Sequence, residues 1–278
     1  MKLSQVLAQR FSLIVTPVVT SCCVTTTPTL AATLATSEAW VNLDNFSHAP
    51  VDIFTLTDTQ TLAIARNSQA VANANADANF VTDPLGTMTK ANNNSLSTAQ
   101  GEGNSYFALA ESNAAVIGYN FMLEEDETFF FDFNAFLGLK SSIDDPEFER
   151  SNAKAEIALN LYDTTDADNW QLLDFLIIAG QLTTAGNGDF LSDDKSTGLT
   201  YFPRHTTFET AFTGNQEMAE ASVKGELSRT FNSLTYLTLV EAKTNRVMVK
   251  TVSESSTLLA LLVFCLIGVG WGIKNKLS

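Results

Sequence analysis

The chain has 278 residues, and 31 acidic against 16 basic side chains give it a formal net charge of −15 at pH 7. This length is sufficient for one large domain with a sizeable core. A surface so acidic repels phosphate backbones, so we expect no nucleic-acid partner. The cysteines, Cys22, Cys23 and Cys265, all lie near the ends. The body between them therefore has no disulfide, thiol nucleophile or cysteine metal site of its own.

Residues 1–31 have the order of a secretory signal peptide. Lys2 and Arg10 give a positive start, residues 11–24 are moderately apolar, and a small-x-small triplet ends at Ala31. We therefore expect export through a secretion translocon and cleavage by signal peptidase between Ala31 and Ala32. The competing interpretation, a buried N-terminal helix, is disfavoured because Pro17 and Pro28 would break one.

A second cleavage site overlaps the first signal. Residues 19–22, Val-Thr-Ser-Cys, resemble a bacterial lipobox, in which Cys22 would be lipidated and become the new N-terminus. Cleavage near Ala31 is the preferred interpretation of the two.

The body, residues 32–251, alternates apolar and polar side chains in many short runs. Alternation over residues 69–80, 129–133, 152–162 and 219–231 predicts half-buried strands, because successive side chains of a strand point to opposite faces. Residues 117–123 alternate too, which places Ile117, Tyr119, Phe121 and Leu123 on one face. Residues 172–179 are apolar on both faces except Asp174, as expected of a central strand.

Turn-forming clusters of Asp, Asn, Gly and Pro separate these runs. The polar stretch from Thr87 to Asn104 is expected to be a long loop. About ten or eleven strands in this order predict an all-β fold, a single antiparallel β-sandwich of jelly-roll type.

Two kinds of site are candidates within the body. Asp163, Asp166 and Asp168 fall in one predicted loop and supply the oxygen ligands that calcium prefers, although their spacing is not that of an EF-hand. Trp40 and Trp170 lie near strand ends, where exposed rings beside polar groups would suit glycan binding. In both cases the ordinary alternative is structural: solvated loop charge for the aspartates and core-edge packing for the rings. We expect no cofactor other than this calcium.

Catalytic motifs are not evident in the sequence. His48 and His205 stand in turn-like contexts, and no G-x-S-x-G or H-E-x-x-H pattern occurs. We therefore expect a non-enzyme. A glycoside hydrolase-like enzyme that uses carboxylates of the acidic loops is the lower alternative.

The C-terminal segment predicts a membrane-spanning helix over residues 256–273. Residues 258–273 are apolar without a break, and with the preceding Ser256 and Thr257 the segment lies within the range of about 17–25 residues that a bilayer core requires. Lys274 and Lys276 follow it, which places this end in the cytoplasm. An exported N-terminus and a cytoplasmic C-terminus give a type I single-pass topology.

The tail, residues 252–278, resembles the PEP-CTERM sorting signal of exosortase-processed bacterial proteins. In that signal a Pro-Glu-Pro motif precedes an apolar helix and a few basic residues. Here Val252, Ser253, Glu254 and Ser255 stand at the motif, so Glu254 is kept and serine replaces both prolines. The phenylalanine-rich run 128–139 and residues 221–246 are also similar to β-rich ectodomains that carry this tail in cyanobacteria.

This resemblance implies export, transient anchoring in the membrane and cleavage near the motif by an exosortase-type enzyme. The sequence thus predicts an exported protein of the cell envelope or extracellular matrix without catalytic activity. The alternative is a carbohydrate-binding module of the extracellular polymer, whose partner would be extracellular polysaccharide.

Overall fold

The computed structural model describes residues 32–82 and 89–252. The predicted signal peptide with Cys22 and Ala31, the sorting residues 253–255 and the predicted membrane helix over 256–273 lie outside the described residues. Within the described ranges, no helix is both long and apolar enough to cross a membrane.

The described residues form two antiparallel sheets and one short 3-10 helix, η1 (Pro203–His205). The strands are β1 (Thr33–Asp44), β2 (Asp52–Ala65), β3 (Gln69–Thr82), β4 (Thr89–Glu102), β5 (Tyr106–Leu123), β6 (Thr128–Ser142), β7 (Glu149–Asp163), β8 (Gln171–Thr184), β9 (Phe190–Lys195), β10 (Leu199–Tyr201), β11 (Thr207–Ala211), β12 (Gln216–Thr230) and β13 (Thr235–Thr251).

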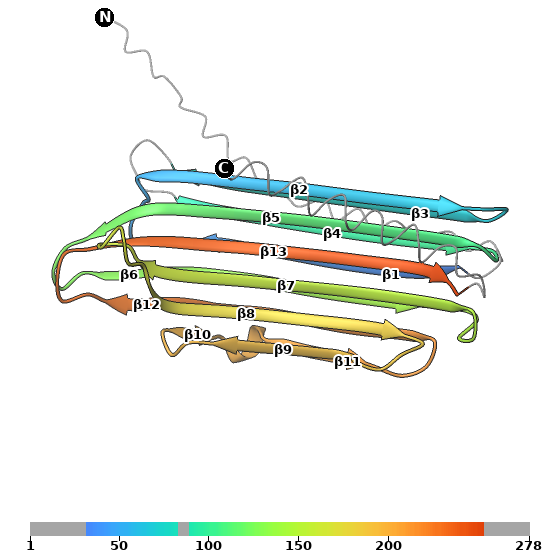
Figure 1. Cartoon of the computed structure of the whole chain (residues 1–278). Coiled ribbons are helices and arrows are strands. Elements are labelled where there is room, and N and C mark those ends of the chain that lie inside the picture. Colours follow the sequence, from blue (N-terminus) through green and yellow to red (C-terminus); the bar gives the residue numbers. More distant parts are fainter. Residues whose placement is uncertain (1–31, 83–88, 253–278) are drawn as a thin grey trace, which may run out of the picture. The chain divides into compact units, whose positions relative to one another are not determined.

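The two sheets lie face to face (Figure 1). The first, sheet A, has the strand order β10-β12-β6-β1-β4-β3, and β11 pairs with β12 as well. The second, sheet B, has the order β2-β5-β13-β7-β8-β9. Strands β2 and β3 thus lie at one side of the sandwich, and the short strands β9, β10 and β11 lie at the other. The predicted all-β fold with antiparallel sheets is confirmed.

The two sheets pack on each other because each strand turns every second side chain, mostly an apolar one, toward the space between them. The inner faces carry Ala, Val, Leu, Ile and Phe, and these residues make one continuous core. Phe121, Phe129 and Phe131 are fully buried, and Phe46 packs on all three with ring centroids 5.1–6.4 Å apart. Phe130, between two buried neighbours on β6, remains 39% exposed. A strand in a sandwich can place only every second side chain in the core.

The strands predicted over 69–80, 129–133, 152–162 and 219–231 are present as parts of β3, β6, β7 and β12. Their predicted inward residues are the buried ones in β6, β7 and β12, and the alanines of β3 are half-buried. The run over 172–179 lies in β8, between β7 and β9, with Asp174 buried.

The predicted loop over Thr87–Asn104 is wrong, because β4 occupies Thr89–Glu102 and lies inside sheet A. Its alternation was hidden because its inward residues include Asn93, Ser95 and Ser97, which are buried although polar. Hydrophobic periodicity cannot reveal a strand whose core-facing side chains are themselves polar.

The face predicted for residues 117–123 is also partly wrong. Phe121 and Leu123 are buried, whereas Ile117 and Tyr119 lie on the outer face of sheet B. The cause is a β-bulge: Leu239 pairs with Gly118 but Leu237 pairs with Phe121, and Asn120 has a φ of 56°. The extra residue shifts the alternation by one position.

Candidate functional site

The outer face of sheet A carries a row of four asparagines, one on each of four neighbouring strands. Asn79 of β3 pairs with Asn92 of β4, Asn92 with Asn42 of β1, and Asn42 with Asn134 of β6. Asn79, Asn92 and Asn42 are exposed, and Asn134 is half-buried. Adjacent strands lie about 4.8 Å apart, so the row presents one neutral amide per strand at a regular spacing.

An aromatic pair lies beside this asparagine row. Trp40 of β1 and Phe136 of β6 are direct cross-strand partners, and their rings stack with centroids 5.6 Å apart and an interplanar angle of 16°. Gly138 makes room for this arrangement, because a Cβ there would lie 2.9 Å from two atoms of the Phe136 ring. The Phe136 ring can therefore lean over Gly138 toward the sheet surface.

The row and the aromatic pair form one surface, which we call the amide–aromatic face. Asn94 pairs with Trp40 and Asp77 pairs with Asn94, which continues the polar surface toward β3. Amides that donate and accept hydrogen bonds, next to stacked rings, are the combination that binds neutral polar ligands with apolar faces. The sequence identified Trp40 but none of its polar neighbours.

Trp170, the other ring predicted to bind glycan, does not lie on this face. It sits just before β8 in sheet B, is 48% exposed, and is tilted against Tyr162 with centroids 6.0 Å apart. The structure therefore does not bring the two predicted tryptophans into one site.

Of the three aspartates predicted to bind calcium, Asp163 is the last residue of β7, and Asp166 and Asp168 lie in the turn that follows. Asp163 accepts a hydrogen bond from the backbone N–H of Thr165 through Oδ1, and Asp166 accepts one from Asp168 in the same way. Among the described residues, no group of three His, Cys, Asp or Glu side chains is arranged to hold a metal ion. The calcium site stays a prediction, which the effect of chelation on the melting temperature would test.

One histidine belongs to a polar cluster that fastens two turns together. His48 Nδ1 lies 2.8 Å from Ser47 Oγ, and His48 Nε2 lies 3.3 Å from Glu127 Oε2. Ser47 Oγ also accepts the backbone N–H of Phe130. The backbone N–H of Glu124 and the neighbouring His48 hold the pKa of Glu127 below its usual value. These contacts join the turn after β1 to the turn before β6.

A pocket of about 390 Å³ lies where β13 ends. Phe148, Glu149 and Val252 line it, among others. Glu149 accepts a hydrogen bond from Tyr106 Oη through one carboxylate oxygen and from the backbone N–H groups of Asp144 and Asp145 through the other. Burial raises the pKa of Tyr106. Both oxygens of the Glu149 carboxylate already accept hydrogen bonds from these donors. We therefore assign to Glu149 a structural role, which is to hold together the segments around the end of β13.

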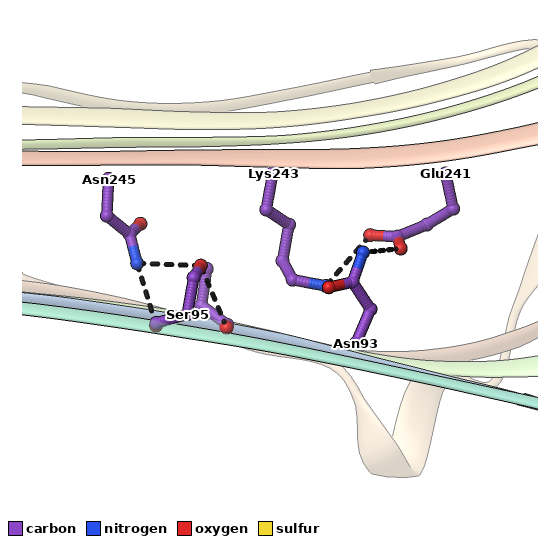
Figure 2. A network of polar contacts seen from close by, with 6 residues as sticks. Asn93, Ser95, Glu241, Lys243 and Asn245 are labelled. Carbon is purple, nitrogen blue, oxygen red and sulfur yellow. Dashed lines mark hydrogen bonds and ion pairs between the residues drawn. The ribbon is translucent and has the colours of Figure 1, made fainter. Parts of the chain in front are cut away.

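A buried polar network lies at the centre of the sandwich, between β13 and β4 (Figure 2). Lys243 Nζ is 3.0 Å from Glu241 Oε1, and Asn93 donates a hydrogen bond to the other oxygen of the same carboxylate. Asn245 Nδ2 donates to the carbonyl oxygen and to Oγ of Ser95, at 2.7 and 2.9 Å. The side chains of Glu241, Lys243 and Asn245 reach from sheet B to sheet A.

Burial dominates the ionisation of this pair. It lowers the pKa of Lys243 to about 8 and raises the pKa of Glu241, while each charge partly offsets the effect on the other. Two carbonyl oxygens, Asn93 Oδ1 and Asn245 Oδ1, have no hydrogen-bond partner among the described residues. The network is therefore costly to bury, and its geometry must compensate.

Comparison with protein-family models, with curated proteins and with solved structures gave no match.

The buried ion pair generates a test of the fold. Lys243→Met should lower the free energy of unfolding by about 3–5 kcal/mol near pH 7, where a lysine with a pKa of about 8 is still charged, because it leaves the Glu241 carboxylate buried without its cation. The loss should shrink toward about pH 5, since a carboxyl whose folded pKa is raised is stabilising when protonated and loses this contribution as pH rises. Urea unfolding followed by tryptophan fluorescence measures both values.

The matched control is Lys154→Met, an exposed lysine on the outer face of β7. It should change stability by well under about 1 kcal/mol. Adding Glu241→Gln to Lys243→Met should recover part of the loss, since no unpaired charge then remains. Equal losses at the two pH values would contradict a buried, unpaired carboxylate.

Proposed function

We propose that the chain is an exported protein of the cell envelope or extracellular matrix that acts by binding and not by catalysis. Its ligand is extracellular polysaccharide, and its binding surface is the amide–aromatic face of sheet A. The observation that carries this proposal is the row Asn79–Asn92–Asn42–Asn134 beside the Trp40–Phe136 stack.

The chemistry of this face suits a neutral sugar polymer. Side-chain amides donate and accept hydrogen bonds without carrying charge, which matches the hydroxyl groups of sugars. Aromatic rings pack on the apolar faces of sugar rings while the amides bind their edges. A chain with a net charge of −15 repels acidic ligands, which favours a neutral glycan.

In this proposal, the N-terminal and C-terminal segments direct the protein to the cell envelope. The signal peptide over 1–31 exports the chain, and the helix over 256–273 then anchors it with its C-terminus in the cytoplasm. An exosortase-type enzyme cleaves near Val252–Ser255. The last strand ends at Thr251, and the Val252 backbone N–H donates to the Phe148 carbonyl at 2.6 Å. The motif thus begins directly at the edge of the folded body. Lipidation of Cys22 is the alternative to cleavage near Ala31. We also propose that the sandwich is of jelly-roll type.

The glycan proposal predicts the effect of one ring. Trp40→Ala should weaken binding to a polysaccharide about tenfold or more, because truncating a central aromatic residue of a binding surface commonly has this effect. Co-sedimentation with a panel of insoluble neutral polysaccharides, followed by a titration on those that bind, measures the change.

Trp170→Ala is the matched control, since it removes the same side chain from a site on the other sheet. It should leave the affinity unchanged. If Trp170→Ala weakens binding and Trp40→Ala does not, the binding surface is wrongly assigned. If no polysaccharide of the panel is retained, the carbohydrate function is contradicted.

The sorting proposal has its own test. Mass-spectrometric mapping of the mature protein from the envelope fraction should find an N-terminus at Ala32 and a C-terminus near residues 252–255. A mature C-terminus at Ser278 in the membrane fraction would indicate a permanent anchor in place of a processed tail. Intact residues 1–31 on cytosolic protein would contradict export.

A further inference from the structure

Strand β2 is a long edge strand of sheet B. It pairs with β5 on one side and has no partner strand on the other among the described residues. Its 14 residues extend over about 46 Å. All of them are exposed except Leu62, which is half-buried. The opposite edge of the sheet, β9, has 6 residues that include Asp193, Asp194 and Lys195.

Edge strands usually carry features that prevent pairing with other chains, such as proline, lysine, bulges or a short length. The β2 edge has none of these, and its charged residues are Asp52 and Asp58 alone. An unprotected edge of this length is a template for another strand. The partner strand that fits the β2 edge is a second copy of β2 itself.

We propose that β2 is a self-association edge, along which a second copy of this chain pairs antiparallel about a two-fold axis through Thr59. In this register Phe54 faces Ile64 of the second copy, Leu56 faces Leu62, and Thr57 faces Thr61. Each pair occurs twice, as a two-fold interface requires. The two copies of sheet B then form one continuous sheet.

The charges of β2 match in the same register. Asp58 faces Gln60 of the second copy, an amide that can donate to its carboxylate. Asp52 faces Arg66, which follows the strand and stays aligned with it through a 2.9 Å hydrogen bond from its backbone N–H to the Ser105 carbonyl. Neither Asp52 nor Arg66 forms an ion pair within the described ranges. Opposite charges across a strand pair are stabilising.

Neighbouring registers lose this match. A shift that centres the axis on Asp58 places the two Asp58 carboxylates opposite each other. A shift that centres it on Gln60 sets Asp58 against Leu62 and Phe54 against Arg66. A register shift by one residue, in which Thr59 of one copy faces Asp58 or Gln60 of the other, sets the outer face of one strand level with the inner face of its partner. The sequence of β2 thus favours the axis through Thr59 over the adjacent alternatives.

The pairing also covers exposed apolar surface. Phe54, Leu56 and Ile64 are 50%, 56% and 43% exposed, and they lie on the outer face of sheet B. Phe54 is adjacent there to Ile117 of β5, and Leu62 to Leu109. Exposed apolar groups that continue onto a neighbouring strand are a feature of interfaces. In the proposed register they pack against the same groups of the second copy.

Strand β3, the edge of sheet A on the same side, does not oppose this approach. Thr59 pairs with Ser112, Ser112 Oγ is 2.9 Å from Ser97 Oγ, and Ser97 pairs with Ala74. The middle of β3 is therefore level with the proposed axis. The only charged residue of β3 is Asp77, and its inward residues there are alanines. The middle of β3 therefore places only small side chains on the inward face beside the approaching copy.

Disulfide trapping tests the register directly in the full chain, purified in detergent with Cys22, Cys23 and Cys265 replaced by Ser. Thr59→Cys should form a disulfide-linked dimer on mild oxidation, because side chains directly opposite each other bring their Cβ atoms to about 4.5–5.5 Å. The yield should exceed that of Thr210→Cys, on the exposed strand β11, by roughly tenfold.

Two further variants distinguish the proposed register from any other close approach of two copies. Thr57→Cys and Thr61→Cys should each crosslink poorly alone, because residue 57 and its copy would lie about 13 Å apart. Their equimolar mixture should crosslink well, since Thr57 faces Thr61. Dimerisation through the C-terminal segment could raise every yield but could not produce this selectivity.

Equal yields for Thr57→Cys, Thr59→Cys and the mixture would overturn the register. A Thr59→Cys yield no higher than that of Thr210→Cys would overturn the association itself. Both results are independent of glycan binding, because β2 belongs to sheet B and the amide–aromatic face to sheet A.

Discussion

Sheet A and sheet B can each remove their apolar side chains from water only by packing on the other, since the described residues include no α-helix to cover either sheet. This mutual burial decides which side of every strand faces inward. The same alternation that buries Val41 and Leu43 of β1 places Trp40 and Asn42 outside. The amide–aromatic face is therefore a consequence of core packing, because its residues occupy the positions that the core leaves over.

The centre of this core is not apolar throughout. Glu241, Lys243 and Asn245 occupy every second position of β13 and point inward. Glu241 bonds to Asn93 and Asn245 to Ser95 of β4 in the other sheet, while Lys243 pairs with Glu241. An apolar stripe of the same volume would often be equally stable or more so. A polar stripe adds directional contacts, which a slipped strand would break. The hydrogen bonds of Glu241 with Asn93 and of Asn245 with Ser95 therefore favour one alignment of β13 with β4 across the sandwich.

Sequence reasoning succeeded where apolar side chains alternate with charged ones. In β7 and β12 each core residue is flanked by a polar one, so the inward face could be read directly. It failed for β4, because Asn93, Ser95 and Ser97 point inward and look like loop residues. It also failed in β5, where the bulge at Asn120 changes the face in mid-strand. In both cases the missing information is tertiary: which strand lies opposite.

The candidate site, too, could be predicted from the sequence only in part. Trp40 could be selected from the sequence, because an aromatic residue near a predicted strand end is conspicuous. The asparagine row could not be found, since its members are distant in sequence and become neighbours only through the pairing of four strands. The role of Gly138 was equally hidden, because it depends on where the Phe136 ring lies.

The central claim is that the outer face of sheet A binds glycan, and hydroxyl-radical footprinting tests it most directly. The protein is oxidised with and without a polysaccharide that it retains, and the modified side chains are mapped by mass spectrometry. The account predicts that oxidation of Trp40 and Phe136 falls in the presence of the polysaccharide while that of Trp170 is unchanged. Protection of Trp170 with no protection of Trp40 or Phe136 would contradict it.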